Sequence, residues 1–245
     1  MTVSNPAYVA IGIYVVYVAI VAVVWRVNRV DYQHLAKDRA TAVRSIVVPI
    51  GLGALVLAIA VTVLRWWHPV LFDDGRSGPT WALLVPALFL LAGILGLRQI
   101  DWRSENRTVL PMLALGTLLV GFAEEVLTRG VLLVGGEQQG WSPTTVFLVS
   151  TGLFALLHGL NAFYGLPWQG ALVQIAITFV AGTAFYVMRL STGTLIVGIL
   201  LHALWDFVTL GAVATDRKAS PLSMAPAALA YVLALVAMVV VLRSS

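Results

Sequence analysis

The stretch that decides the fold is residues 108–134, TVLPMLALGTLLVGFAEEVLTRGVLLV. A helix that crosses about 30 Å of hydrocarbon needs about 20 mainly apolar residues, so this stretch predicts a transmembrane helix. Glu124, Glu125 and Arg129 lie inside it. A charged residue at the centre of such a helix costs about 2.5–3.5 kcal/mol for Asp, Lys or Arg. Charged residues inside a transmembrane helix therefore usually face other parts of the protein or water, and they indicate a functional site.

The rest of the chain has the same apolar character. Of its 245 residues, 60% are hydrophobic and 11% are charged, and its mean hydropathy is +0.94. A soluble domain of this length needs more charge to cover its surface, so the bilayer is the expected solvent. With the stretch above, the sequence predicts eight transmembrane helices, at residues 7–25, 45–64, 80–97, 108–134, 144–163, 170–188, 194–214 and 225–242.

These segments predict an all-α, polytopic integral membrane protein. We expect one transmembrane domain over residues 1–245, with a catalytic core in the predicted helices 4–7, about residues 108–214. The strands of a membrane β-barrel would alternate in hydrophobicity over about 10 residues, which is not the pattern of this sequence. The first apolar run lacks the basic n-region and the cleavage site of a signal peptide, so we expect it to be a retained helix.

The charge pattern predicts how the chain sits in the membrane. The formal net charge is +4 and the pI is about 9.7, but most lysines and arginines fall in the loops after the predicted helices 1, 3 and 7. Cytoplasmic loops are enriched in these residues. We therefore expect the plasma (inner) membrane as location, both termini outside, and no nucleic-acid partner. The absence of cysteine from the sequence excludes thiol catalysis and cysteine-ligated metal.

The two glutamates of the quoted stretch differ in their expected surroundings. At about 100° per residue, Arg129 lies about 40° from Glu125 and about 140° from Glu124. Glu at position i and Arg at i+4 is also the favourable order for an ion pair. Glu125 is therefore expected to be neutralised within its own helix as a structural clamp, while Glu124 can point elsewhere. A free carboxylate of this kind suits a general base.

Two further polar clusters lie inside predicted helices. Predicted helix 5 contains FALLHGLN, residues 154–161, and predicted helix 7 contains HALWD, residues 202–206. His202 and Asp206 are four residues apart, so they lie on one helix face. An intrahelical hydrogen bond between them would fix the histidine tautomer.

Each polar residue also has a purely structural explanation. His158 can form an interhelical hydrogen bond, Asn161 can cap or bridge the end of its helix, and Phe154 can pack in the core. The coincidence of three polar clusters, all within predicted helices, favours function instead. We expect Glu124, His158 and His202 to meet at one depth around a water molecule.

Together, the three clusters resemble the signature of the CPBP family of intramembrane proteases, which contains type II CaaX prenyl endopeptidases and bacteriocin-processing (Abi) enzymes. The family pattern is E-E-x-x-x-R, then F-x-x-x-H, then H-x-x-x-N or D. The chain has these letters in this order at residues 124–129, 154–158 and 202–206. The resemblance implies a hydrolase that cuts peptide bonds within a membrane cavity, and eight spans also fit the family.

The resemblance also implies a role for each matching residue. Glu124 would activate a water molecule, and His158 would be hydrogen-bonded to that water or to the carboxylate. His202 and Asp206 would bind the developing oxyanion, without a covalent intermediate. The supporting residues are Glu125, Arg129, Phe154 and Asn161, of which the first two would hold the shape of the site.

Asp206 stands where many relatives carry asparagine. Asparagine can donate a hydrogen bond to an oxyanion, whereas an ionised aspartate cannot. Asp206 must then be protonated, orient His202, or pair with Arg129. Glu124, His158, His202 and Asp206 are also acceptable zinc ligands, although the chain has no H-E-x-x-H motif. We favour a mechanism without a cofactor and keep zinc as the alternative.

Two other classes of function remain open. Intramembrane Glu, His and Asp can relay protons in a proton-coupled transporter, although no inverted repeat is visible in the sequence. A non-enzymatic scaffold or immunity protein could keep the fold and bind a membrane partner. For the protease, we expect a membrane-anchored or exported protein as substrate, cut near a membrane-proximal segment. A site that opens on the outer face would favour exported proteins.

Overall fold

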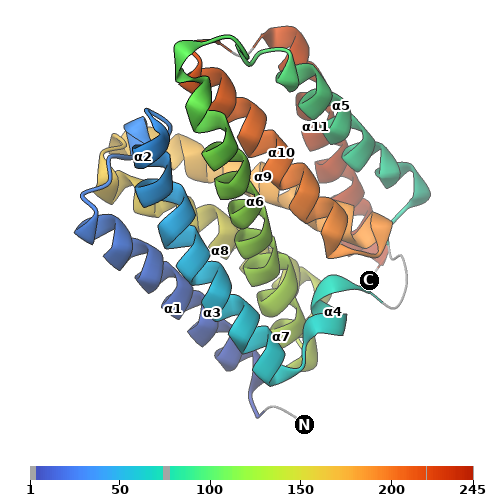
Figure 1. Ribbon diagram of the computed structural model, residues 1–245. Helices are drawn as coiled ribbons and strands as arrows, with labels where there is room; N and C mark the ends of the chain where they lie inside the picture. The colour runs from blue at the N-terminus through green and yellow to red at the C-terminus, as the bar shows by residue number, and fades with distance from the viewer. Residues whose placement is uncertain (1–3, 74–77, 219, 245) are drawn as a thin grey trace.

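The computed structural model describes residues 4–73, 78–218 and 220–244, and Figure 1 shows a bundle of long helices. Eight helical segments are long and apolar enough to cross a membrane: Pro6–Val27, Arg39–Leu64, Thr80–Leu97, Glu105–Gln138, Pro143–Tyr164, Trp168–Thr192, Leu195–Ala214 and Pro221–Ser244. Each coincides with one predicted transmembrane helix. The residues described form no β-strand, only an isolated bridge between Phe72 and Thr194. The prediction of an all-α polytopic membrane protein is therefore confirmed.

Some spans are single α-helices and others are composites. The single helices are α1 (Pro6–Val27), α9 (Trp168–Thr192), α10 (Leu195–Ala214) and α11 (Pro221–Ser244). The second span joins α2 (Arg39–Ala42), η2 (Val43–Val47) and α3 (Val48–Leu64), and the third joins η3 (Thr80–Leu83) and α5 (Leu84–Leu97). The connections contain η1 (Tyr32–His34) and α4 (Trp67–Leu71).

The two spans that carry the first two motifs are not regular α-helices throughout. The fourth consists of η4 (Glu105–Val109), α6 (Leu110–Glu125), the π-helical η5 (Val126–Leu132) and α7 (Leu133–Gln138). The fifth consists of α8 (Pro143–Leu157) and the 3₁₀ segment η6 (His158–Tyr164). The expectation of ordinary α-helical geometry was therefore wrong after Glu125 and at His158. π-helical turns inside α-helices are rare and occur frequently at functional sites.

A close approach of α6 to α10 brings the first and third motifs together. α6 lies between α3 and α10 (Figure 1). A Cβ atom at Gly121 of α6 would lie only 2.6 Å from the carbonyl oxygen of Ile199 and 2.9 Å from the amide nitrogen of Ala203, both in α10. Glycine at this position lets the two backbones approach, as small residues do between membrane helices. Glu124 and Glu125 thereby face His202 across the contact.

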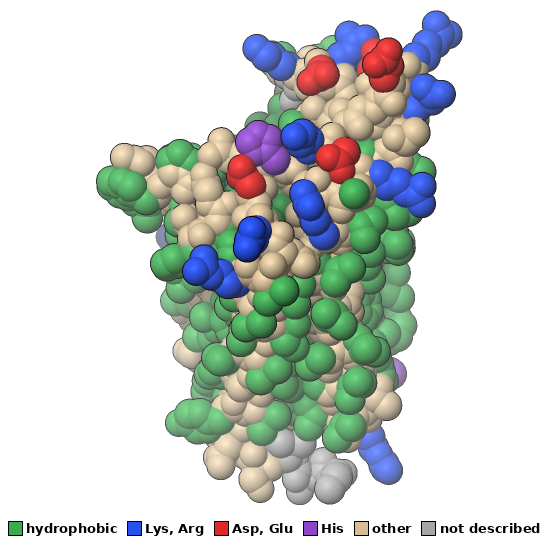
Figure 2. Space-filling model, turned by 60° about the vertical axis from the view of Figure 1, so that its left-hand side comes forward, with side chains coloured by type: hydrophobic (Ala, Val, Ile, Leu, Met, Phe, Trp, Pro, Cys, Tyr) green, Lys and Arg blue, Asp and Glu red, His purple; other side chains and the backbone are tan. Residues whose placement is uncertain are grey.

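The surface has an apolar belt and one charged end. Figure 2 shows hydrophobic side chains over the length of the helices, with most of the visible lysines, arginines, aspartates and glutamates gathered at the upper end. That end, called the charged end below, includes the loops at residues 28–38, 98–104 and 215–218, which follow α1, α5 and α10. α1 begins at the opposite end (Figure 1). The charged end is the one that the positive-inside rule predicts to be cytoplasmic.

Candidate active site

Glu125 is held by two partners inside the bundle. Nη1 of Arg129 donates to Oε1 of Glu125 at 3.0 Å, and neither side chain is exposed. Nδ1 of His202 lies 2.9 Å from the same oxygen. The ion pair expected from the i, i+4 spacing is present. The contact with His202 was not expected, because it joins residues 77 positions apart and the sequence pattern carries no signal for it.

Glu124 has different surroundings from its neighbour. Its Oε2 atom is buried and has no hydrogen-bond partner in the described part of the chain. Nε2 of His202 lies 3.9 Å from this oxygen and 3.6 Å from Oδ2 of Asp206. Because the His202 ring is fixed through Nδ1 by Glu125, its Nε2 atom is presented to Glu124 and Asp206. Of the three options for Asp206, its position beside Nε2 agrees with orienting His202, and no Asp206–Arg129 ion pair forms among the described residues.

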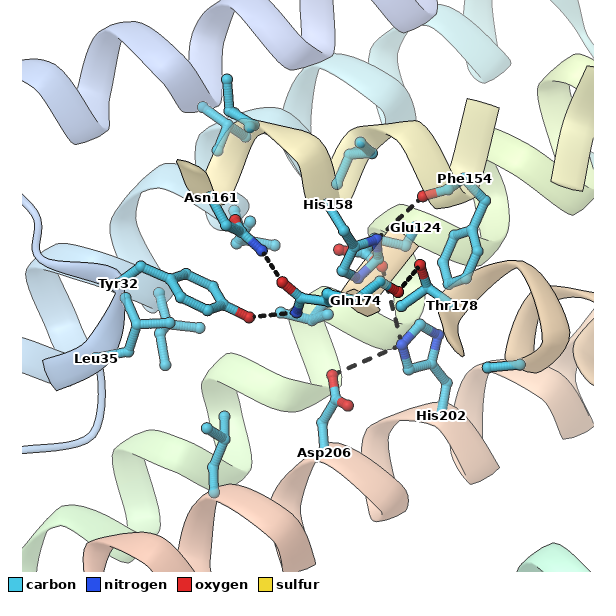
Figure 3. A pocket seen from close by; sticks show the side chains of 18 of the residues that line it. Tyr32, Leu35, Glu124, Phe154, His158, Asn161, Gln174, Thr178, His202 and Asp206 are labelled. Carbon is cyan, nitrogen blue, oxygen red and sulfur yellow. Dashed lines mark hydrogen bonds and ion pairs between the residues drawn. The ribbon is translucent and has the colours of Figure 1, made fainter. Parts of the chain in front are cut away.

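His158 joins the group from the point where α8 ends. Its Nδ1 atom lies 3.0 Å from the carbonyl oxygen of Phe154, so this nitrogen can donate to the backbone and leave Nε2 as an acceptor. Figure 3 shows His158, Glu124, His202 and Asp206 around one space. The structure therefore brings together the three clusters that the sequence places in separate helices.

Two phenylalanines support the charged groups. The guanidinium carbon of Arg129 lies 3.9 Å from the ring centroid of Phe154, within the range of a cation–π interaction. The ring of Phe185, from α9, stacks on His202 at 4.6 Å with an interplanar angle of 15°. A Cβ at Gly182 would lie 2.7 Å from Nη2 of Arg129, so this glycine lets α9 approach. Phe185 and Gly182 belong to no motif, and sequence reasoning missed them.

Arg189 is a second buried arginine that sequence reasoning placed in a loop, beyond the predicted helix 6. It lies in α9 and is 2% exposed. Its guanidinium pairs with Asp73 and donates to the carbonyl oxygens of Val70 and Arg129. Arg189 therefore ties the end of α4 to the π-helical segment that follows Glu125.

A cavity of about 340 Å³, called the site cavity below, is lined by Glu124, His158, His202 and Asp206. It also contacts Tyr32, in the loop after α1 at the charged end. The site cavity thus extends from the acidic and imidazole groups toward the charged end.

A chain of hydrogen bonds follows the wall of the site cavity (Figure 3). Nδ2 of Asn161 donates to Oε1 of Gln174 at 2.9 Å, and Nε2 of Gln174 donates to the hydroxyl of Tyr32 at 2.6 Å. Burial raises the pKa of Tyr32 above its usual value, which keeps the phenol protonated. Asn161 thus bridges η6 to α9, one of the two structural uses expected for it. Gln174 and Tyr32 were not identified from the sequence.

The possible zinc ligands do not form a ligand set in this arrangement. Over residues 4–73, 78–218 and 220–244, no three His, Asp or Glu side chains lie where they could hold one metal ion. As they stand, Glu124, His158, His202 and Asp206 form no such group, and the proposed mechanism uses no metal.

Comparison with known proteins agrees with the resemblance seen in the motifs. Residues 106–208 match the family model described as type II CAAX prenyl endopeptidase Rce1-like. The matched region contains all three motifs. No curated protein and no solved structure matches the chain. Residues 106–208 of this integral membrane protein are thus similar to the Rce1-like type II CAAX prenyl endopeptidases, a family of proteases.

Proposed function

We propose that the protein hydrolyses a peptide bond of a membrane-anchored protein with a water molecule that Glu124 activates. One observation carries this proposal: Glu124 lines the site cavity, and its buried Oε2 atom has no hydrogen-bond partner among the described residues. Buried carboxylate oxygens are normally satisfied, and water is the simplest partner that a polar cavity supplies. Oε2 of Glu125 also has no hydrogen-bond partner among the described residues, but Oε1 of Glu125 is bound to Arg129 and His202, and Glu125 does not line the site cavity.

In this mechanism, the Glu124 carboxylate takes one proton from the water as the water oxygen attacks the substrate carbonyl carbon. The C–N bond then breaks, and the proton passes to the leaving amine. His158 orients the water through Nε2, because its Nδ1 is bound to the Phe154 carbonyl. No covalent enzyme intermediate forms.

His202 and Asp206 act on the developing oxyanion in this proposal. When Nε2 of His202 carries a proton, it can donate to the oxyanion. Asp206 lies 3.6 Å from that nitrogen and favours the proton there. Aspartate would therefore act through His202 in this chain, whereas the asparagine of many relatives can donate directly.

The direction of the site cavity supports a substrate that approaches from the charged end. Tyr32 contacts the cavity at that end, and the loop charges favour the cytoplasmic side for it. This favours anchored proteins at the cytoplasmic face over exported ones. The matched family is described as acting on CAAX prenyl proteins, so we propose a lipidated C-terminal segment as the substrate. Apolar wall residues suit such a substrate: Val18, Val21, Leu157 and Ile177.

The first experiment compares protein termini in three strains: one that lacks the protein, one that carries Glu124→Gln, and one that carries Glu105→Gln. Glu105 is exposed at the start of the same span and serves as the matched control. A membrane-protein terminus that changes equally in the first two strains, and not in the third, supports the proposal. If no terminus changes in the first two strains, the result favours the hypothesis of a scaffold or a transporter.

A second experiment tests the substrate class with purified protein in liposomes. The reporter is a peptide that ends in a C-a-a-X sequence with a farnesylated cysteine, with a fluorophore and a quencher on opposite sides of the bond after that cysteine. Cleavage of this peptide but not of its unmodified form is the expected result. Cleavage of neither peptide would contradict the proposed substrate.

A further inference from the structure

Tyr17 of α1 is a buried tyrosine whose hydroxyl is unused by the fold. The residue is 1% exposed, and its hydroxyl has no hydrogen-bond partner in residues 4–73, 78–218 and 220–244. Buried tyrosine hydroxyls usually find a partner. Tyr17 lines the site cavity together with Glu124, so the two residues border the same space.

The packing around Tyr17 fixes its ring in place. A Cβ at Gly53 of α3 would lie 2.5 Å from Cε2 and 2.7 Å from Cδ2 of Tyr17. Contacts this short are too close for any side chain, so the glycine leaves room for the ring between α1 and α3. Tyr17 therefore occupies a position prepared for a ring, and its hydroxyl is the part that lacks a structural use.

Tyr14, one turn earlier in α1, shows what a purely structural tyrosine looks like here. Its hydroxyl donates to the carbonyl oxygen of Leu153 in α8 at 2.9 Å. Of these two tyrosines on α1, Tyr17 is the one whose hydroxyl has no hydrogen-bond partner among the described residues.

We propose that the Tyr17 hydroxyl donates a hydrogen bond to the water that Glu124 activates, which makes Tyr17 a further catalytic residue. The inference rests on the proposed function of Glu124. A phenol donates and a carboxylate accepts, so one water between them satisfies both buried atoms. Both residues line the site cavity, whose volume is about 340 Å³. Tyr17 keeps its own proton throughout, and the proton of the water still passes to Glu124.

Tyr17 lies outside the region that matches the family model, residues 106–208. The Tyr17 hydroxyl would add a hydrogen-bond donor to the site. An ionised Asp206 supplies no such donor. The Tyr17→Phe variant removes only the oxygen and keeps the ring that packs on Gly53. The variant loses a hydrogen bond to a water molecule that becomes negatively charged as Glu124 takes its proton. We therefore expect kcat to fall about 10- to 100-fold while KM changes little.

The test measures cleavage of the farnesylated reporter and the thermal unfolding midpoint for wild type, Tyr17→Phe, Tyr14→Phe and Glu124→Gln. We expect Tyr17→Phe to lose kcat without a lower midpoint, because removing an unsatisfied buried hydroxyl does not cost stability. Tyr14→Phe should lower the midpoint and keep kcat near wild type, because it removes a bond to Leu153.

Each outcome separates this inference from the proposed function. If Glu124→Gln is inactive and Tyr17→Phe cleaves at the wild-type kcat, the role of Tyr17 is overturned and that of Glu124 stands. A lower midpoint in Tyr17→Phe, in proportion to its lost activity, would make Tyr17 structural and also overturn the inference. If Glu124→Gln cleaves as fast as wild type, the proposed function fails, and the inference fails with it.

Discussion

Replacing Arg129 by methionine should be among the most destabilising single changes in this protein. Arg129 and Glu125 are both fully buried, and Nη1 of Arg129 donates to Oε1 of Glu125 at 3.0 Å. Removing one partner of a buried ion pair costs about 3–5 kcal/mol, because the other charge is left unpaired. Loss of the cation–π contact with Phe154 adds about 1 kcal/mol. Two nitrogens of Arg129 lack hydrogen-bond partners among the described residues, which offsets part of this, so we expect about 3–5 kcal/mol in all.

A double variant isolates the charge effect from the packing effect. Arg129→Met combined with Glu125→Met removes both charges; Nδ1 of His202 loses its partner, and Oγ1 of Thr128 loses the hydrogen bond that Arg129 donates. The double variant should therefore be more stable than Arg129→Met alone. Arg243→Met is the matched control, because Arg243 is exposed near the end of α11. It should change the free energy of unfolding by less than about 0.5 kcal/mol.

Equilibrium unfolding by SDS in mixed micelles, followed by tryptophan fluorescence, measures these differences, and the chain has 8 tryptophans to report it. A cost for Arg129→Met of less than about 1 kcal/mol would show that the pair is not a buried clamp. A double variant less stable than the single one would show that the unpaired glutamate is not the source of the cost.

Two further predictions concern contacts outside the motifs. Gly121→Ala should separate α6 from α10 and lower both folding yield and peptide cleavage, because its Cβ would lie 2.6 Å from a backbone oxygen. Gly152→Ala, where the added Cβ meets no described atom within 4 Å, should instead be neutral or stabilise by about 0.5–1 kcal/mol; equal behaviour of the two variants would contradict the packing argument. Arg189→Met should destabilise by about 3 kcal/mol or more, because it strands the carboxylate of Asp73 and buried carbonyls. Arg217→Met breaks a largely exposed ion pair and should cost at most about 1 kcal/mol in the same SDS titration. A comparable loss of stability in Arg189→Met and Arg217→Met would contradict the structural role of Arg189.

The eight spans could be predicted from the sequence because bilayer thickness sets a length that apolar runs must reach. The Glu125–Arg129 pair could be predicted because it lies within one helical turn, where spacing determines distance. The meeting of the three clusters could be inferred only from their coincidence in separate predicted helices.

The remaining features depend on contacts between helices, which spacing does not encode. The bond from Glu125 to His202 requires the close approach at Gly121. Arg189 looked like a loop charge because it follows an apolar run, yet its partners come from α4 and η5. In the sequence, Tyr17 is one more aromatic residue in an apolar helix. Only the structure shows that it lines the site cavity and that its hydroxyl has no hydrogen-bond partner among the described residues.

The central claim is that Oε2 of Glu124 has no hydrogen-bond partner among the described residues because its partner is the reacting water. The most direct test compares Glu124→Gln with wild type and Glu105→Gln for cleavage of the reporter peptide, with the unfolding free energy measured on the same samples. The claim predicts that Glu124→Gln lowers kcat by about 10²–10⁴-fold or more and unfolds at the same SDS concentration as the other two proteins. Cleavage by Glu124→Gln at the wild-type rate, or lost activity that only follows lost stability, would contradict it.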